Sequence, residues 1–454
     1  MQYSVRADQS RRHDGLATLL ASGSAGFRLD LDIDPPRVTG CGPSSGRYVS
    51  RCPVTDGTAA DLLVLAACAY AADRMSDREC AADRWTRDIS IEVPVGDPGL
   101  WTGTKDALQE CLSFLSGDRW ALAFSPRAVP LRDPAGATKH RLARPFRADA
   151  VCLFSGGLDS FIGAIDWLDA HPQGHLLLVG HYDGDVAGPR SQQVALSKQL
   201  HGHYGQRFEL VQFRAGADSA GHDTSSRSRS LLFIAGGIAA AAHFGPNTPV
   251  LMPENGLIAL NVPLTPSRRG SCSTRTAHPR FMDDMREILA RLGIGNPLLN
   301  PIQDKTKGEC VVACANQALL SAAANTSVSC SKAGRKDHWQ RHTASSCGCC
   351  VPCIYRRAAL HAAGLDNEVY GLDVCSGEVD LNETKRSGDD LRALLSFLRR
   401  NYSESEILRL LRGNGLPLGP GAGGAADLVG RGMDEVRTWV RAKGTPDMRA
   451  RAGL

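Results

Sequence analysis

The chain lacks the features that mark membrane proteins, secreted proteins and highly basic nucleic-acid binders. No apolar run approaches the roughly 20 residues that a membrane span needs, because the most apolar stretch, 231–244, is rich in alanine and glycine. The first residues include no apolar segment of a secretory signal, so we expect a cytoplasmic protein. The 52 Lys and Arg residues against 48 Asp and Glu leave a formal charge of only +4 over 454 residues. A nucleic-acid partner is therefore possible but is not indicated by charge.

Three further features are absent: a disulfide framework, a Walker A motif and an internal repeat. Most of the 15 cysteines are scattered through apolar or mixed contexts rather than placed at the spacings of a disulfide framework. The Walker A motif, GxxxxGK[ST], occurs nowhere in the chain, so any phosphate-binding loop must be of another kind. No internal repeat is present either, and repeat architectures are therefore excluded.

Residues 1–145 alternate β-like and helical patterns and contain no cluster of chemically active side chains. We therefore predict an N-terminal α+β accessory domain that shapes the substrate site or docks a partner. Its predicted elements are strands at 27–33, 89–95 and 120–124 and helices at 59–72 and 106–115.

Residues 146–370 alternate short apolar strands with helices, which predicts an α/β domain: a parallel sheet with helices on both faces. The predicted strands lie at 150–154, 176–183, 208–213 and 250–252, and the predicted helices at 161–168, 192–200 and 230–242. Ligands of such sheets bind beyond the carboxyl ends of the strands, where Ser155–Ser160, His181–Asp183 and Glu254–Asn255 fall. Residues 371–454 read as a C-terminal helical extension, interrupted by a flexible segment at 419–425.

The sequence SGGLDS follows the first predicted strand and opens the first predicted helix. Backbone N–H groups and the helix dipole at such a turn point at a common spot that suits an anion, and adjacent glycines let phosphates approach. Hydroxyl groups at both ends add donors, and the aspartate is placed to hold Mg²⁺ beside the phosphates. We expect the whole loop to bind the nucleotide: Ser155, Gly156, Gly157, Leu158, Asp159 and Ser160.

A cysteine cluster, C-G-C-C-V-P-C, lies near residue 350. Cys347, Cys350 and Cys353 follow at intervals of three, and Cys330 stands upstream across a polar insert. Four thiolates that converge at this spacing close a tetrahedral zinc site, with Cys349 as a bystander. An iron–sulfur cluster and unligated thiols are the alternative interpretations.

The motif SGGxDS after a buried strand resembles the PP-loop of the N-type ATP pyrophosphatases, which are adenine nucleotide alpha-hydrolases. Together with the cysteine cluster, it resembles the QueC-like family of 7-cyano-7-deazaguanine synthases over roughly residues 148–365. Arg229 in SRSLLF and Lys307 with Glu309 in TKGE are similar to further motifs of that family. The resemblance implies ATP, Mg²⁺ and Zn²⁺ as cofactors, phosphate or substrate contacts by Arg229 and Lys307, and catalytic roles for Asp159 and Lys307.

The chain also departs from that family. STRTAHPRF, at Ser273–Phe281, replaces the family's substrate loop, and both terminal regions are additions. These departures resemble the QueC-like proteins of bacterial anti-phage operons. Since a histidine can act as a base near neutral pH, we predict that His278 deprotonates an attacking amine.

The implied reaction is adenylation of a carboxylate, expected to belong to a 7-deazaguanine, with release of pyrophosphate and transfer to an amine. The additional regions favour an amine on a partner protein of the same defence operon over ammonia. Two other functions stay open. One is a PP-loop enzyme that modifies tRNA or another nucleic acid with the cysteines as a sulfur relay, and the other is an ATP-binding sensor subunit of a defence complex.

Overall fold

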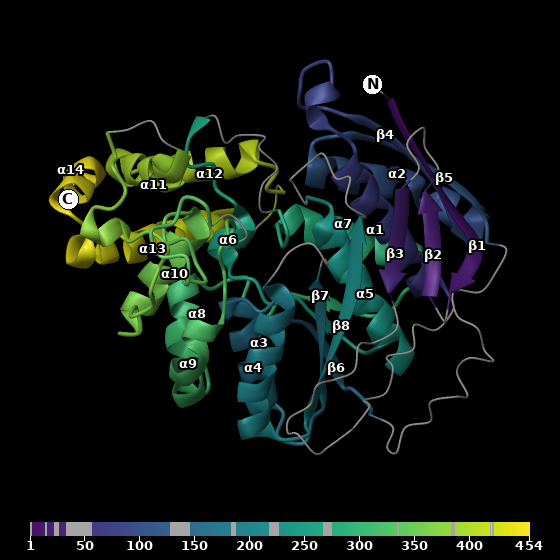
Figure 1. The fold of residues 1–454 in the computed structure, drawn as a ribbon, viewed down its shortest axis with the longest axis horizontal. Coiled ribbons are helices and arrows are strands. Elements are labelled where there is room, and N and C mark those ends of the chain that lie inside the picture. Colours follow the sequence, from purple (N-terminus) through teal and green to yellow (C-terminus); the bar gives the residue numbers. More distant parts are fainter. Residues whose placement is uncertain are drawn as a thin grey trace.

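The protein is described by a computed structural model (Figure 1). Every structural statement below concerns the residues that it describes, and the helices and strands keep the labels of the figure. These residues are 2–13, 16–21, 27–32, 57–127, 146–182, 188–217, 227–266, 275–333, 336–382, 386–417, 419 and 422–454.

The centre of the molecule is a parallel sheet of five strands in the order β10-β9-β6-β7-β8. Their bounds are β6 Ala150–Leu153, β7 Leu176–Tyr182, β8 Phe208–Ala217, β9 Val250–Leu251 and β10 Leu298–Leu299. The chain builds outward from β6 through β7 to β8 and then returns to place β9 on the other side of β6. The strand order therefore reverses between β6 and β9, and such a reversal opens a crevice at the carboxyl ends of the strands.

Helices cover both faces of this sheet, so the predicted α/β class is confirmed. The side chains of β7 alternate: Leu177 and Val179 join one apolar core, whereas Leu176 and Leu178 join the other. On the first face lie α1 Thr58–Met75, α5 Arg229–Phe244 and α7 Pro279–Arg291. On the second lie α3 Leu158–Ala170 and α4 Pro189–Tyr204. Outside these two, α8 Lys307–Ala313 packs on α3, α9 Gln317–Ala323 on α4 and α10 Val351–Ala362 on α8.

The N-terminal strands continue the same sheet rather than forming one of their own. Strand β3 (Phe27–Asp32) pairs antiparallel with β8, and the order runs on through β2 (Leu16–Ala21), β1 (Gln2–His13), β4 (Asp88–Val95) and β5 (Arg119–Pro126). The core around α1 and α2 (Pro98–Ser116) is continuous with the core around α5 and α7. The expected boundary near residue 145 therefore separates two stretches of one ten-stranded sheet. The predicted strands and helices of this region agree with β3, β4, β5, α1 and α2.

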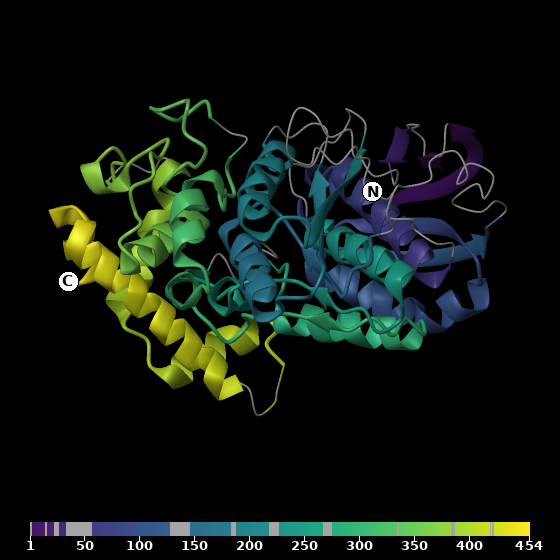
Figure 2. The same ribbon diagram turned by 90° about the horizontal axis from the view of Figure 1, so that it is seen from below.

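The last helices gather at the opposite end of the molecule from the N-terminal strands (Figures 1 and 2). They are α11 Asp389–Arg400, α12 Glu404–Gly413, α13 Ala422–Lys443 and α14 Pro446–Ala452. Their apolar residues form a further core together with the buried cysteine segment around residue 350. The flexible segment expected at 419–425 is wrong in its second half, because α13 begins at Ala422. None of the helices among the described residues is long and apolar enough to cross a membrane.

Candidate functional site

The loop Ser155–Ser160 lies at the reversal point of the sheet and runs from the end of β6 into the first turn of α3, which begins at Leu158. Gly156 has a φ of +86°, a conformation that residues other than glycine rarely adopt, and this turns the chain away from the strand. The Ser155 hydroxyl accepts a hydrogen bond from Gly157 N at 3.2 Å and lies 3.3 Å from the Ser160 hydroxyl. Helix α3 has no side-chain cap from its N-cap residue Gly157, and the first of its N–H groups, that of Leu158, donates to the Ser329 hydroxyl at 3.4 Å. The other N–H groups of a first helical turn have no partner within the helix and can bind a ligand.

Asp159 does not face solvent; its side chain is one member of a buried polar cluster. Its Oδ1 accepts a hydrogen bond and ion pair from Lys307 Nζ at 2.5 Å, and its Oδ2 accepts from Asn255 Nδ2 at 2.6 Å. Burial acts to raise the pKa of Asp159, but the charge of Lys307 and these hydrogen bonds outweigh it and hold the pKa below its usual value. Asp159 is therefore a carboxylate at neutral pH, neutralised by a lysine that is itself only 2% exposed.

Glu254 is a second carboxyl group in this cluster. It directly precedes Asn255, and its backbone is fixed by Asn300, whose Nδ2 donates to Glu254 O at 2.8 Å. Burial, followed by the negative charge of Asp159, raises the pKa of Glu254 to about 8. The site thus contains one ionised carboxylate and one carboxyl group that holds its proton into the neutral range.

Lys307 reaches Asp159 because it is the first residue of α8. Thr306 caps this helix, its hydroxyl accepting from Glu309 N at 3.1 Å while Glu309 accepts from Thr306 N at 2.9 Å. Helix α13 supports the same turn: Glu435 accepts a hydrogen bond from Thr306 Oγ1 and another from Gly308 N, the latter at 3.1 Å. The TKGE motif therefore positions the lysine through a capping box and through the C-terminal extension.

Arg229 begins α5 and lies at the carboxyl ends of the neighbouring strands. Its Nε donates to Nδ1 of His181, the residue before the last of β7, at 3.2 Å. His181 Nε2 lies 3.0 Å from Ala215 O, so this nitrogen carries the proton and Nδ1 is the acceptor. Burial, then the charge of Arg229, lowers the pKa of His181 to about 3, and the ring is neutral. None of the described residues bonds the two terminal nitrogens of Arg229.

The segment before Cys330 closes over the loop. Val328 N donates to Gly156 O at 3.0 Å, and Leu158 N donates to the Ser329 hydroxyl at 3.4 Å. Because Cys330 follows directly, the position of this segment depends on the cysteine cluster. The loop Ser155–Ser160 and the cysteine cluster are thus adjacent parts of one structure.

The four predicted cysteines converge, with their sulfur atoms all within 4.8 Å of one another. The Sγ atoms of Cys347 and Cys353 are 3.8 Å apart, and those of Cys330 and Cys350 are 4.0 Å apart. Thiolates at about 2.3 Å from a single ion in a tetrahedron would lie about 3.8 Å apart, so these distances suit one metal ion. Cys349 is not one of the four sulfurs that are all close to one another, as predicted, although its Sγ lies 3.7 Å from that of Cys347. The cluster could therefore bind a metal such as zinc.

His278 is enclosed by the surrounding helices, and its predicted role as a general base stays a prediction. The side chain is fully buried, packs 5.1 Å from the ring of Phe114 and caps α7 by accepting from Arg280 N at 3.2 Å. Burial, then the charges of Arg275 and Arg280, lowers the pKa of His278 to about 3. The beginning of the expected substrate loop, Ser273 and the next residue, lies outside the described residues.

Most predicted site residues therefore come together, while His278 is held by α2 and α7. Asn255 and Glu254 were placed at the correct edge of the sheet but given no role. Sequence reasoning also missed Ser329 and Glu435, whose only signals were their hydrogen-bonding side chains.

A scan of protein-family models, a search of curated proteins and a search of solved structures found no match to this chain.

Proposed function

We propose that this protein is a QueC-like, PP-loop ATP pyrophosphatase that adenylates a carboxylate and is similar to QatC of the Qat anti-phage system. The observation that carries the proposal is the pairing of Asp159 in the SGGLDS loop with Lys307 from TKGE, 148 residues away in sequence and joined at 2.5 Å. The two motifs had been linked only by resemblance. Their meeting at the reversal point of a parallel sheet supports a nucleotide site there.

The loop supplies donors where charge develops on the leaving pyrophosphate. A carboxylate oxygen of the substrate attacks the α-phosphorus of ATP, and the bond from this phosphorus to the bridging oxygen breaks. The N–H groups at the start of α3 and the hydroxyls of Ser155 and Ser160 then face the departing negative charge. An amine nitrogen next attacks the acyl carbon, the bond from this carbon to the AMP oxygen breaks and AMP departs with the bonding electrons, and the nitrogen loses one proton to water.

Lys307 and Arg229 would neutralise the phosphates. Lys307 now pairs with Asp159, and a bound nucleotide offers this lysine a phosphate oxygen instead. Asp159 fits Mg²⁺ only under that exchange, because Lys307 and Asn255 occupy both of its oxygens. The exchange would free one carboxylate oxygen for the cation while the site keeps its charge balance.

For the cysteine cluster we propose one structural zinc ion held by Cys330, Cys347, Cys350 and Cys353. The sulfur spacing favours a single ion over a four-iron cluster, whose larger size would hold its ligand sulfurs farther apart. Four cysteines leave no open coordination position, and three of them are buried. This burial favours a structural site over the sulfur relay of a tRNA-modifying enzyme.

The substrate that we propose is a 7-deazaguanine carboxylate, and the acceptor is an amine on a protein encoded beside this one. ATP–pyrophosphate exchange tests the first step across candidate carboxylates, with 7-carboxy-7-deazaguanine first. Exchange that depends on this acid supports the proposal, and exchange with no carboxylate among the candidates would overturn it.

The acceptor needs a separate experiment. Intact-mass spectrometry of co-expressed neighbouring gene products should find an added mass equal to the acylated base, which disappears with Asp159→Ala in this chain. Unmodified neighbours beside a soluble amide or nitrile would instead identify ammonia as the acceptor.

A further inference from the structure

We infer that Asp73, on helix α1 of the N-terminal region, is a positioning residue for Arg229. It holds the first turn of α5 in place and so sets where the guanidinium lies at the edge of the sheet. This inference rests on the proposed function, in which Arg229 contacts the phosphates or the substrate. The N-terminal region then helps to shape the site, although neither the SGGLDS loop nor the cysteine cluster lies in that region.

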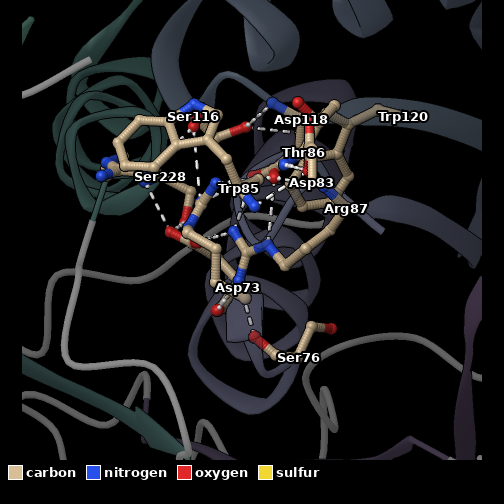
Figure 3. Close-up of polar contacts among 12 residues, drawn as sticks. Asp73, Ser76, Asp83, Trp85, Thr86, Arg87, Ser116, Asp118, Trp120 and Ser228 are labelled. Atoms are coloured by element: carbon tan, nitrogen blue, oxygen red, sulfur yellow. Dashed lines mark hydrogen bonds and ion pairs between the residues drawn. The ribbon is translucent and has the colours of Figure 1, made fainter. Parts of the chain in front are cut away.

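The anchor of the arrangement is Arg87, which is fully buried and lies just before β4 (Figure 3). Its five N–H donors are all used. Nε and Nη2 donate to the Asp118 carboxylate at 3.0 and 2.6 Å, and Nη2 also donates to Asp73 Oδ1 at 2.6 Å. Nη1 donates to the backbone oxygens of Asp73 and Ser76 at 2.7 and 2.8 Å. Burial acts to lower the pKa of Arg87, but the two carboxylates outweigh it and raise the pKa.

The other oxygen of Asp73 reaches across to α5 (Figure 3). Asp73 Oδ2 accepts from Ser228 N at 3.0 Å and from the Ser228 hydroxyl at 2.8 Å. Ser228 is the N-cap residue of α5; it makes no side-chain cap to its own helix, and its hydroxyl donates to Asp73. A carboxylate at the N-terminus of a helix is favourable, since it faces the positive end of the helix dipole. Asp73 thus fixes the residue next to Arg229.

Helix α1 also supports the second contact of Arg229. The ring of Tyr70 packs edge-on against His181, with 5.8 Å between the ring centroids, and His181 accepts from Arg229 Nε. Tyr70 and Asp73 are three residues apart and therefore share a face of α1. One helical face thus holds both the residue before Arg229 and its hydrogen-bond partner.

Asp118 provides the matched control, because it belongs to the same buried network without touching α5. It pairs with Arg87 and, at 3.0 Å, with Arg78. Asp73→Asn and Asp118→Asn each remove one buried charge facing Arg87 and keep the side-chain volume. Only Asp73→Asn weakens the hydrogen bonds from Ser228 to helix α1. A role confined to stability predicts the same behaviour from both variants.

The experiment measures hydrogen exchange in the first turn of α5 and KM for ATP in full-length protein. We expect Asp73→Asn to raise the exchange rate at 229–232 at least about tenfold and KM by about 10- to 100-fold, the scale of a misplaced binding group. We expect Asp118→Asn to lower the melting temperature by a similar amount while exchange and KM stay near the wild-type values. In an Arg229→Ala background, Asp73→Asn should raise KM no further.

Equal exchange at 229–232 in the two variants would overturn the inference, as would an additive effect on KM in the Arg229→Ala background. Failure of the proposed function gives a different result. In that case Arg229→Ala leaves nucleotide affinity unchanged, while the exchange comparison still decides whether Asp73 holds α5.

Discussion

The regions before and after the parallel sheet are joined to it in different ways. The N-terminal region lengthens the sheet through β3 and shares one apolar core with it, and its contact with α5 depends on buried charges around Arg87. The C-terminal helices pack instead on a core that contains the cysteine cluster, and they reach α8 through Glu435. The N-terminal region therefore supports Arg229, and the C-terminal helices support Lys307.

The two regions should therefore respond differently to mutation. Buried opposite charges stabilise only while both partners are present, so the N-terminal support is sensitive to loss of a single charge. The C-terminal helices pack on the core that contains the four converging thiols, and under the proposed function a bound metal ion would add to the stability of that core. The predictions below test this contrast, beginning with the largest expected effect.

Cys350→Ser removes one ligand from the cysteine cluster and should have the largest effect. Binding of a structural zinc ion contributes about 10–16 kcal/mol in small zinc domains, and part of that is folding energy. We expect loss of zinc, measured by mass spectrometry of the metal content, together with loss of soluble protein. Cys349→Ser is the control and should retain about one zinc ion per chain. A brown protein with visible absorption, or full zinc content in Cys350→Ser, would contradict the assignment.

Arg87→Met should be the most damaging single change in the N-terminal region. It leaves the carboxylates of Asp73 and Asp118 buried without their shared cation, a loss that typically costs about 3–5 kcal/mol of unfolding free energy. Urea denaturation measures the cost. The matched control is Arg119→Met, because Arg119 pairs with Asp88 at 3.6 Å with both side chains more than half exposed. This control should cost less than about 1 kcal/mol. Equal costs would show that the network contributes no more than a surface pair.

Glu435→Ala should weaken the support of Lys307 from the C-terminal side. The change leaves Gly308 N and the Thr306 hydroxyl without their acceptor in a partly buried place, which costs about 1–3 kcal/mol. Asp434→Ala, one residue away and exposed, should stay within about 0.5 kcal/mol of wild type in the same urea titration. A result in the opposite order would mean that α13 does not support α8.

The pH dependence of stability should carry a smaller contribution from Glu254. Its pKa rises from 4.5 to about 8 on folding, so the folded state binds the proton more tightly than the unfolded state does. The contribution is fully present below pH 4.5 and is lost as the pH rises through 8. Since Glu254 is partly exposed and water screens part of its repulsion by Asp159, we expect a loss of about 1–2 kcal/mol. Glu254→Gln should remove this slope, and an unchanged slope would contradict the raised pKa.

Much of the fold could be predicted from the sequence, because its signals are local. Continuous apolar runs separated by helical patterns gave the strands around Ser155, and the spacing of the cysteines gave the cluster. The join between β3 and β8 could not be predicted, since pairing of distant strands leaves no trace in either pattern. From the sequence, Asp159 and Lys307 are each expected to contact the ligand and not each other. Only the tertiary structure reveals that each satisfies the other, and that His278 is enclosed by Phe114.

The central claim is that Asp159 and Lys307 form a site that splits ATP at its α-phosphorus, and the products of ATP turnover test it most directly. With the carboxylate substrate present, wild-type protein should release AMP and pyrophosphate. Lys307→Met and Asp159→Asn should each lower the rate by about 10²-fold or more, as expected when an oriented charge is lost from a reacting centre. Formation of ADP, or turnover that Lys307→Met leaves unchanged, would contradict the account.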